Sequence, residues 1–394
     1  MLGQIKVLVV FGTRPEIIKL APVYRALLSC PNVNVHAFYT GQHVELADGL
    51  LELFGIKADY CAQLMGNHSS LAEKTGQVMV QIGSLLRRQA YDWLIVQGDT
   101  VSALAGAAAG FLARVPVAHV EAGLRTNDLY SPWPEEFDRR VVTLCAQLHF
   151  PPTEVARANL QAEGVASDRI VVTGNTVIDA LLYASERIGA GYVPHNPKLR
   201  ALANDKKLVL VTGHRRENFG EPMQRLLAAL ADLARDGDKL IVFPVHLNPN
   251  VLREVHKRLG SSRNVCLLEP LRYPDFVYLL SRAWIVVTDS GGIQEEAPSF
   301  RIPIVITRDT TERPEVISAG FGHLVGCDAI GIADIVRRFT AGDRPSTVGG
   351  NNPFGDGRAA ERIAAAISSG KFGTRRAAAA ERLAPVSSAI QAAE

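Results

Sequence analysis

The sequence has few cysteines, and their positions exclude two common kinds of site. The 394-residue chain has five cysteines that are widely separated: Cys30, Cys61, Cys145, Cys266 and Cys327. No Cys-x-x-Cys pair and no Cys/His cluster occurs, which excludes a structural zinc framework and a thioredoxin-like redox pair. An odd number of cysteines in a chain of this size is typical of reduced thiols, so we expect a cytoplasmic location.

Long hydrophobic runs and an excess of one charge are also missing. The stretch of lowest polarity, residues 103–113, is about half the length of a membrane span, and the apolar run near the N-terminus ends at Gly12. The 42 Lys and Arg residues nearly balance the 40 Asp and Glu residues. This balance gives no overall attraction to nucleic acid or to an anionic membrane. We therefore expect a soluble protein that binds neither.

Several standard cofactor and metal motifs are absent as well. The sequence contains no complete Gly-x-Gly-x-x-Gly fingerprint, no P-loop and no His-Glu-x-x-His pair. These absences disfavour NAD-dependent redox chemistry, ATP hydrolysis and zinc-dependent hydrolysis. We expect no cofactor and no metal.

Short β-branched runs alternate with helical patterns along most of the chain. In segments such as 17–28 and 223–234, apolar residues recur at the spacing of an α-helix. This alternation is typical of parallel sheets covered by helices in α/β domains. The runs that we predict to be buried strands are residues 6–10, 35–40, 93–97, 117–120, 170–172, 208–212, 239–243, 265–268, 285–288 and 304–306.

A segment rich in glycine, proline and polar residues separates two sets of predicted strands. We predict an N-terminal Rossmann-like domain over residues 1–184, a linker region over 185–207 and a C-terminal Rossmann-like domain over 208–356. The two parallel sheets would face each other across a cleft. Open sheets of this kind bind ligands beyond the carboxyl ends of their strands. The Ala-rich segment 371–394 is predicted to be a flexible tail.

Polar residues follow the predicted strands of the N-terminal half. Arg14 and Lys19 come after the first strand, where a helix start would favour an anion; solvated basic side chains are the alternative. Asp99 follows the run WLIVQ, although it could simply cap the next helix. Glu121 ends the run VAHV just before a glycine turn.

A charged run, PWPEEFDRR, follows soon afterwards. It contains Glu135, Asp138 and Arg139 behind two prolines. Surface salt bridges are the simplest interpretation of such a run taken alone.

The C-terminal half carries its polar residues in corresponding places. His214 follows the run LVLVT beside two arginines, and Arg313 follows the last predicted strand. Glu296 lies one turn into a helix, within reach of a ribose diol. The run IVVT is followed by Ser290, Gly291 and Gly292, and the backbone N–H groups of these three residues would face a phosphate.

Taken together, the strand ends predict acid–base chemistry on a phosphorylated substrate. Carboxylates Asp99, Glu121 and Glu135 come from one half, and His214 comes from the other. A separate structural explanation would be needed at each strand end if these residues had no common site. We therefore expect a nucleotide-linked substrate in the cleft.

The order of these motifs resembles a known family. FGTRPEIIKLAPV, TGQH, QGDT, HVEAGLRT, PWPEEFDRR, GNTVIDA, TGHRREN, PVHLNPNV, TDSGGIQEE and RDTTERPE stand between Val7 and Ile363 as they do in the non-hydrolysing UDP-N-acetylglucosamine 2-epimerases. The resemblance implies the two-domain GT-B fold, with a last helix over residues 357–370 that crosses back to the N-terminal domain. It also implies a homodimer.

The resemblance further implies a reaction. Members interconvert UDP-GlcNAc and UDP-ManNAc by eliminating UDP to 2-acetamidoglucal and adding it back after protonation of the opposite face of C2. The product would supply ManNAc-type sugars for cell-surface polysaccharide. Positions that match the family's catalytic residues are Asp99, Glu121, Glu135 and His214, the last of these near the phosphates. Positions that match UDP-sugar contacts are Arg14, Lys19, Arg139, Phe276, Ser290, Gly291, Gly292, Glu296 and Arg313.

One of these positions and one neighbouring position allow a second interpretation. Phe276 matches the residue that packs against uracil, although a core phenylalanine is the alternative. Asp138 stands where the family usually has asparagine, and an added carboxylate there could shift the pKa of a neighbour or alter sugar selectivity.

Other functions compatible with the motifs stay open. The same chemistry could act on a modified UDP-sugar such as a UDP-2,3-diacetamido uronic acid. A hydrolysing epimerase would release free ManNAc, and a GT-B glycosyltransferase would not need all three carboxylates. A non-catalytic UDP-sugar-binding regulator would keep only the nucleotide motifs.

Overall fold

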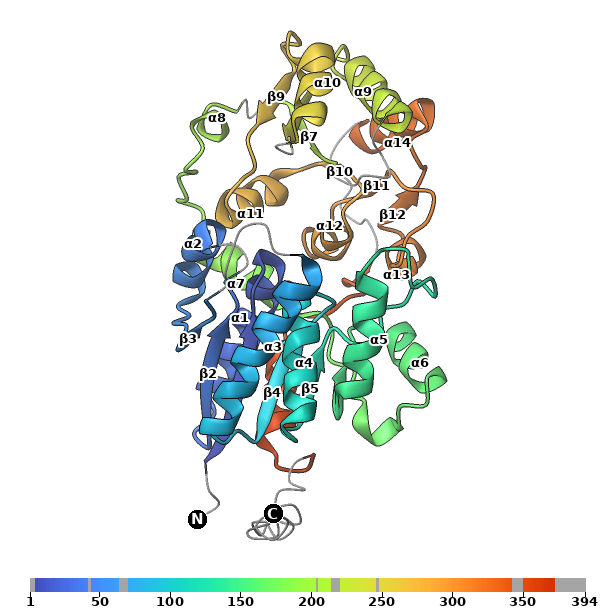
Figure 1. The fold of residues 1–394 in the computed structure, drawn as a ribbon. Helices are drawn as coiled ribbons and strands as arrows, with labels where there is room; N and C mark the ends of the chain where they lie inside the picture. Colours follow the sequence, from blue (N-terminus) through green and yellow to red (C-terminus); the bar gives the residue numbers. More distant parts are fainter. Residues whose placement is uncertain are drawn as a thin grey trace, which may run out of the picture.

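The chain forms two parallel six-stranded sheets, one in each half of the molecule; in Figure 1 the N-terminal half lies below the C-terminal half. The structure is a computed structural model, and it describes residues 4–41, 44–63, 70–202, 205–213, 220–245, 248–341 and 350–372. Within these ranges, no helix combines enough length with enough hydrophobicity to cross a bilayer.

The first sheet has the strand order β3-β2-β1-β4-β5-β6. Its strands are β1 (Ile5–Phe11), β2 (Val33–Tyr39), β3 (Tyr60–Cys61), β4 (Trp93–Gln97), β5 (Val117–Val120) and β6 (Leu148–Phe150). The helices of this half are α1 (Arg14–Leu28), α2 (Val44–Phe54), α3 (Leu71–Arg88), α4 (Val101–Leu112), α5 (Glu135–Cys145), α6 (Glu154–Ala162) and α7 (Thr176–Ile188).

The second sheet has the order β12-β11-β10-β7-β8-β9. Its strands are β7 (Lys207–Thr212), β8 (Lys239–Pro244), β9 (Val265–Leu268), β10 (Ile285–Thr288), β11 (Ile304–Ile306) and β12 (Gly322–Leu324). The helices that follow α7 are α8 (Pro197–Arg200), α9 (Glu221–Leu233), α10 (Pro249–Leu259), α11 (Tyr273–Arg282), α12 (Gly291–Glu296), α13 (Pro314–Ser318), α14 (Ala329–Thr340) and α15 (Ala359–Ser368).

Both sheets have the same topology. In each, the first strand in sequence lies in the middle, and the chain winds outward to one side and then to the other. This is the doubly wound order of dinucleotide-binding sheets, in which ligands bind where the winding reverses. The reversals lie between β1 and β4 and between β7 and β10. The predicted fold of two Rossmann-like parallel sheets is confirmed.

The secondary structure differs from the prediction at short segments near the sheet edges. Residues 170–172 do not form a strand: Ile170 makes a single bridge to His149, and the chain then turns into α7. The edge strands β3, β6 and β12 were not predicted. Each has only two or three residues, too few for a periodic pattern to reveal.

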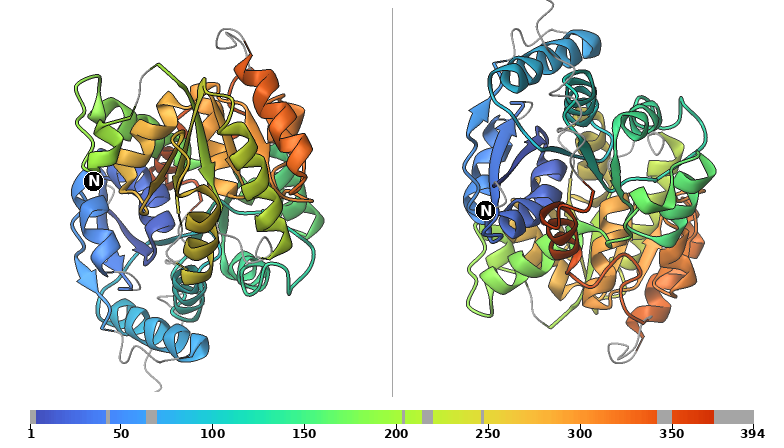
Figure 2. Two further views of the ribbon diagram at one scale, coloured as in Figure 1. Left: turned by 90° about the horizontal axis from the view of Figure 1, so that it is seen from above. Right: turned by 90° about the horizontal axis from the view of Figure 1, so that it is seen from below.

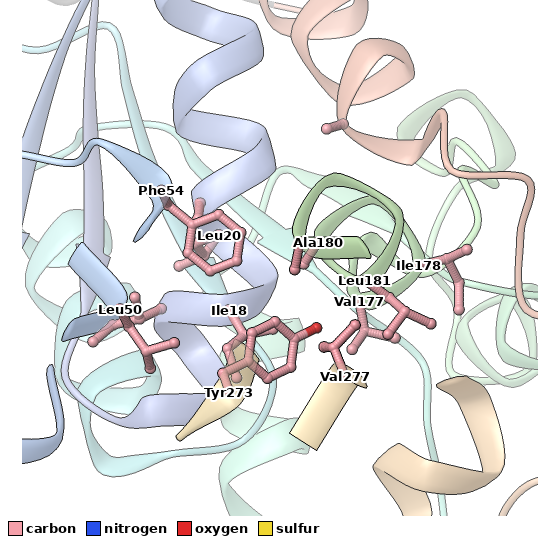
Figure 3. Close-up of a cluster of buried hydrophobic side chains, with 14 of the residues drawn as sticks. Ile18, Leu20, Leu50, Phe54, Val177, Ile178, Ala180, Leu181, Tyr273 and Val277 are labelled. Atoms are coloured by element: carbon pink, nitrogen blue, oxygen red, sulfur yellow. The ribbon is translucent and has the colours of Figure 1, made fainter. Parts of the chain in front are cut away.

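A buried apolar cluster joins the two halves (Figure 3). Helix α7 packs against α1 on one side and α11 on the other. Figure 3 shows side chains from four helices converging there: Ile18 and Leu20 of α1, Leu50 and Phe54 of α2, Val177 and Leu181 of α7, and Tyr273 and Val277 of α11. Helix α7 thus holds the halves together behind the cleft.

The last described helix, α15, lies against the N-terminal half. It contacts α1 and α7, and the view from below shows it beside the N-terminal strands and helices (Figure 2). Its first turn is fixed by Asp179, whose carboxylate accepts from the N–H groups of Ala359 and Ala360 at 3.3 and 2.8 Å. The flexible tail that we predicted over 371–394 lies outside the described residues from 373 onward.

Candidate functional site

A cavity of about 480 Å³ lies between the two halves. The first turns of α1, the ends of β7 and β8, the segment around the start of α11 and the first turn of α12 line it. Six residues that the sequence singled out meet in its walls: Arg14, Lys19, Phe276, Ser290, Gly292 and Glu296. They come from positions up to 282 residues apart, counted from Arg14 to Glu296.

The turn that places Arg14 is fixed by a buried glutamate. Thr13 is the N-cap of α1, and Glu16 completes a capping box. The Glu16 carboxylate accepts from the N–H groups of Gly12 and Thr13 at 3.1 and 2.7 Å, and from the hydroxyl of Thr100 at 2.5 Å. Burial outweighs these bonds and raises the pKa of Glu16 to about 7. Sequence reasoning missed this residue, although the Thr-x-x-Glu spacing was its signal.

Lys19, in the second turn of α1, and Glu121, directly after β5, form a buried ion pair. The Lys19 ammonium donates to Glu121 Oε2. The same oxygen accepts from Gln97 Nε2 at 3.2 Å and Asn175 Nδ2 at 3.4 Å. Glu121 has φ +62°, a left-handed conformation that is uncommon for a residue with a side chain and is often found at functional sites.

The C-terminal half brings a second ion pair next to the first. Arg313 Nε donates to Glu295 Oε1 at 2.6 Å, and Glu295 Oε2 lies 3.8 Å from the Lys19 ammonium. Burial favours the neutral form of Lys19, but the charges of Glu121 and Glu295 outweigh it and raise the pKa of Lys19. Lys19 is therefore a cation that touches carboxylates from both halves.

Gly291 and Arg313 lie in close contact. A Cβ atom on Gly291 would lie 2.5 Å from the Arg313 guanidinium carbon. The sequence predicted Gly291 for its backbone N–H, and the structure adds a steric reason for glycine at this position.

Glu296 lines the cavity, and its pKa is raised. Tyr273 donates to its Oε1 at 3.4 Å. Burial, and then the charge of Glu295, raise the pKa of Glu296 to about 7 although Lys19 and Arg14 oppose the shift. Phe276 follows Tyr273 by one turn of α11 and is half-buried; it lines the same cavity and also packs against the apolar core.

A second group of charges stands at the end of β4. Arg139 donates to Asp99 Oδ2 from Nε at 2.9 Å, with Nη2 at 2.6 Å from the same oxygen. The N-cap of α4 is Thr100, so Asp99 is not the helix cap. The carboxylate of Glu136, fully buried, also binds Arg139. The run PWPEEFDRR is thus partly buried and faces the strand ends, and is not a surface salt-bridge network.

The three predicted catalytic carboxylates do not line the cavity itself. Val120 pairs with Gln97 across β5 and β4, so Asp99 and Glu121 follow the ends of adjacent strands. Glu121 reaches the cavity through Lys19. His214 lies outside the described residues.

Metal-binding geometry is not found in the parts that the structure describes. They contain no group of three or more His, Cys, Asp and Glu side chains that could hold an ion. All five cysteines lie in the described ranges, and none of them forms a disulfide there.

Comparisons with known proteins agree with one another. A family model described as UDP-N-acetylglucosamine 2-epimerase matches residues 25–368. A UDP-N-acetylglucosamine 2-epimerase of Escherichia coli (strain K12) is 46% identical over 378 residues, which cover 93% of this chain and 99% of the relative.

Solved structures give the same result. The UDP-GlcNAc 2-epimerase of Neisseria meningitidis bound to UDP-GlcNAc superposes with a TM-score of 0.85 at 40% identity, covering 93% of this chain and all of that one. The Methanocaldococcus jannaschii UDP-GlcNAc 2-epimerase in complex with UDP-GlcNAc and UDP gives a TM-score of 0.76 at 32% identity, again with 93% and 100% coverage.

Proposed function

The chain belongs to the UDP-N-acetylglucosamine 2-epimerase family, and on this basis we propose that it interconverts UDP-GlcNAc and UDP-ManNAc by inverting C2 of the sugar. One structural observation carries the proposal. The cavity between the sheets is lined by cations, a glycine turn and the buried Glu296, and Lys19 in its wall pairs with carboxylates of both halves. No metal and no cofactor take part in the proposed reaction.

The C-terminal half would hold the nucleotide. Phe276 would pack against the uracil, and Glu296 would accept hydrogen bonds from the ribose hydroxyls. The diphosphate would lie between Arg14 and the turn at Ser290 and Gly292, all of which line the cavity. Cations and backbone amides suit this task because they stabilise UDP as a leaving group.

Arg313 and Arg139 would complete the binding of the charged groups. Arg313 touches Gly291 and pairs with Glu295, at the edge of the same turn. Arg139 pairs with Asp99, which places its guanidinium beside the acid–base residues.

The acid–base step would use Asp99, Glu121 and Glu135, with His214 near the phosphates. One carboxylate removes the weakly acidic C2 proton, so it must be held close to that carbon. The electron pair of the C2–H bond forms a C1–C2 double bond, and the C1–O bond breaks to release UDP. A second group then protonates the other face of C2 as UDP adds back to C1.

The ion pair of Lys19 links binding to this step. Glu121 accepts from Lys19, Gln97 and Asn175. A diphosphate that attracts Lys19 would compete with Glu121 for this ammonium group. We propose that the halves, residues 1–184 and 208–356, close around the substrate and exclude water.

The assembly and location are also part of the proposal. Large apolar side chains stand exposed on the neighbouring helices α3, α4 and α5: Val80, Phe111, Leu112 and Leu144. We propose that this face forms a homodimer, which light scattering would detect. The five cysteines form no disulfide in the described ranges, and we propose a cytoplasmic location because thiols persist in a reducing compartment.

Proton NMR with UDP-GlcNAc in D₂O tests the function. Growth of UDP-ManNAc with deuterium at C2 is the expected result, since the lost proton exchanges with solvent. Accumulation of free ManNAc and UDP would assign the chain to hydrolysing chemistry. Bound UDP without turnover would point to a modified UDP-sugar, and Asp138 is the buried group that would be examined first.

A further inference from the structure

Asp138 is a buried carboxyl group without a hydrogen-bond partner at Oδ2. It lies in the first turns of α5 and is only 2% exposed. Its Oδ2 contacts no donor in the described part of the chain. A buried carboxylate without a donor is costly, and the cost falls when the group takes up a proton.

The groups around Asp138 make its ionised form still less favourable. The negative charges of Asp99 and Glu135 act on it, and Arg139 is the cation that opposes them. That guanidinium is already bound to Asp99 and Glu136. Oε2 of Glu135 is likewise buried without a donor within the described ranges. Carboxyl groups therefore outnumber cations here.

Among the described residues, the elements packed against α5 bring no compensating charge. Helix α4 packs against α5, and its sequence from Val101 to Leu112 contains no titratable side chain. Strand β5 brings His119, and burial lowers the pKa of that imidazole to about 3, so the ring is neutral. Burial first, and then Asp99 and Glu135, raise the pKa of Asp138 to about 7.

We propose that Asp138 is an ionisable positioning residue of the site, which holds a proton in the active enzyme and inactivates the site when it ionises. The inference rests on the proposed function. Asp138 acts through Asp99 and Glu135, the proposed acid–base carboxylates whose negative charges act on it. Once ionised, it adds a further negative charge beside these two groups and changes the electrostatic field in which they would transfer protons. The added charge also repels the diphosphate.

The pH profile of Asp138→Asn tests the proposal. Asparagine keeps the shape of the side chain and stays neutral at every pH. Wild-type kcat/KM is expected to fall above pH 7 by about tenfold per pH unit, and this fall should be absent or move up by more than one unit in the variant. Asp168→Asn, at an exposed position, serves as the matched control with a wild-type profile. The same alkaline fall in Asp138→Asn would overturn the proposal.

A direct titration separates this inference from the proposed reaction. Carbon-13 NMR of protein labelled at the aspartate carboxyls should show a resonance that titrates near pH 7 and disappears in Asp138→Asn. If the wild type shows it but does not epimerise UDP-GlcNAc, the proposed function fails and the proton on Asp138 stands. If no such resonance exists, the inference fails whatever the enzyme's activity.

A second variant covers the case in which Asp138→Asn does not fold. Asp99→Asn removes one of the negative charges that act on Asp138. The titration of Asp138 should then move to lower pH. An unchanged titration would overturn the proposed coupling.

Discussion

Replacing Gly291 with alanine would show how firmly Arg313 is held. A Cβ atom at Gly291 would lie 2.5 Å from Cζ and from Nη1 of Arg313. The guanidinium ends a flexible side chain, so an unrestrained arginine would move away at little cost. Arg313 is restrained by Glu295 at 2.6 Å and by Glu312 at 3.4 Å.

The loss of stability in Gly291→Ala follows from the contacts that Arg313 would lose if its guanidinium moved. Carbon atoms in contact prefer about 3.5–4.0 Å, so the guanidinium must move by about 1 Å or more. That movement breaks the bond to Glu295, whose side chain is 1% exposed. Removing the partner of a buried charge costs about 3–5 kcal/mol, and alanine returns about 0.5–1 kcal/mol in a helix. We expect a net loss of about 2–4 kcal/mol from these two values.

Gly292→Ala is the matched control for stability. A Cβ atom there meets only Ser290 Oγ, at 4.0 Å. This variant should be as stable as the wild type or more stable by up to about 1 kcal/mol. Urea denaturation followed by tryptophan fluorescence would compare the two, since Trp284 lies just before β10 in the same half. Equal midpoints for the two variants would refute the argument that Glu295 fixes Arg313.

Three further predictions concern the site. Asp99→Asn and Glu121→Gln should abolish turnover in the NMR assay while calorimetry still detects UDP binding; loss of UDP binding by a folded variant would contradict their roles. Treatment with EDTA should leave activity unchanged, and inactivation that one specific metal reverses would contradict a metal-free reaction. Burial raises the pKa of Glu296 from 4.5 to about 7, so its contribution to stability is present below pH 4.5 and is lost as the pH rises to 7. Between pH 5 and pH 8, the free energy of unfolding of Glu296→Gln should therefore rise relative to that of the wild type by up to about 3 kcal/mol, as measured by urea denaturation. A difference between the two proteins that does not change with pH would contradict this.

The gathering of residues that follow different strands could be predicted from the sequence because it follows from the fold. Parallel strands that wind outward from the middle bring their carboxyl ends to one edge of each sheet, and Arg14 and Ser290 both line the cavity between the halves. The long central strands were found because runs of buried β-branched residues are a strong pattern. The short edge strands β3, β6 and β12 carry no such pattern. Packing against their neighbours determines them.

The partners of each charged group could not be predicted. Nothing in the sequence around Glu295 indicates its partners. Its side chain binds Arg313 and approaches Lys19, which belongs to the opposite half. The left-handed backbone of Glu121 has no sequence signal either. The contacts of Glu295 arise from the way the two halves face each other, and nearby residues in sequence do not encode that arrangement.

The unliganded ion pairs also order the events of the proposed reaction. Lys19 touches Glu121 of its own half and lies 3.8 Å from Glu295 of the other. A diphosphate entering the cavity must compete with both carboxylates for this one ammonium group. When the diphosphate binds Lys19, Glu121 loses this charged donor and keeps the side-chain amides of Gln97 and Asn175. On this mechanism Lys19 holds Glu121 in the empty site and releases it when the nucleotide is bound, so proton removal is coupled to the presence of the leaving group.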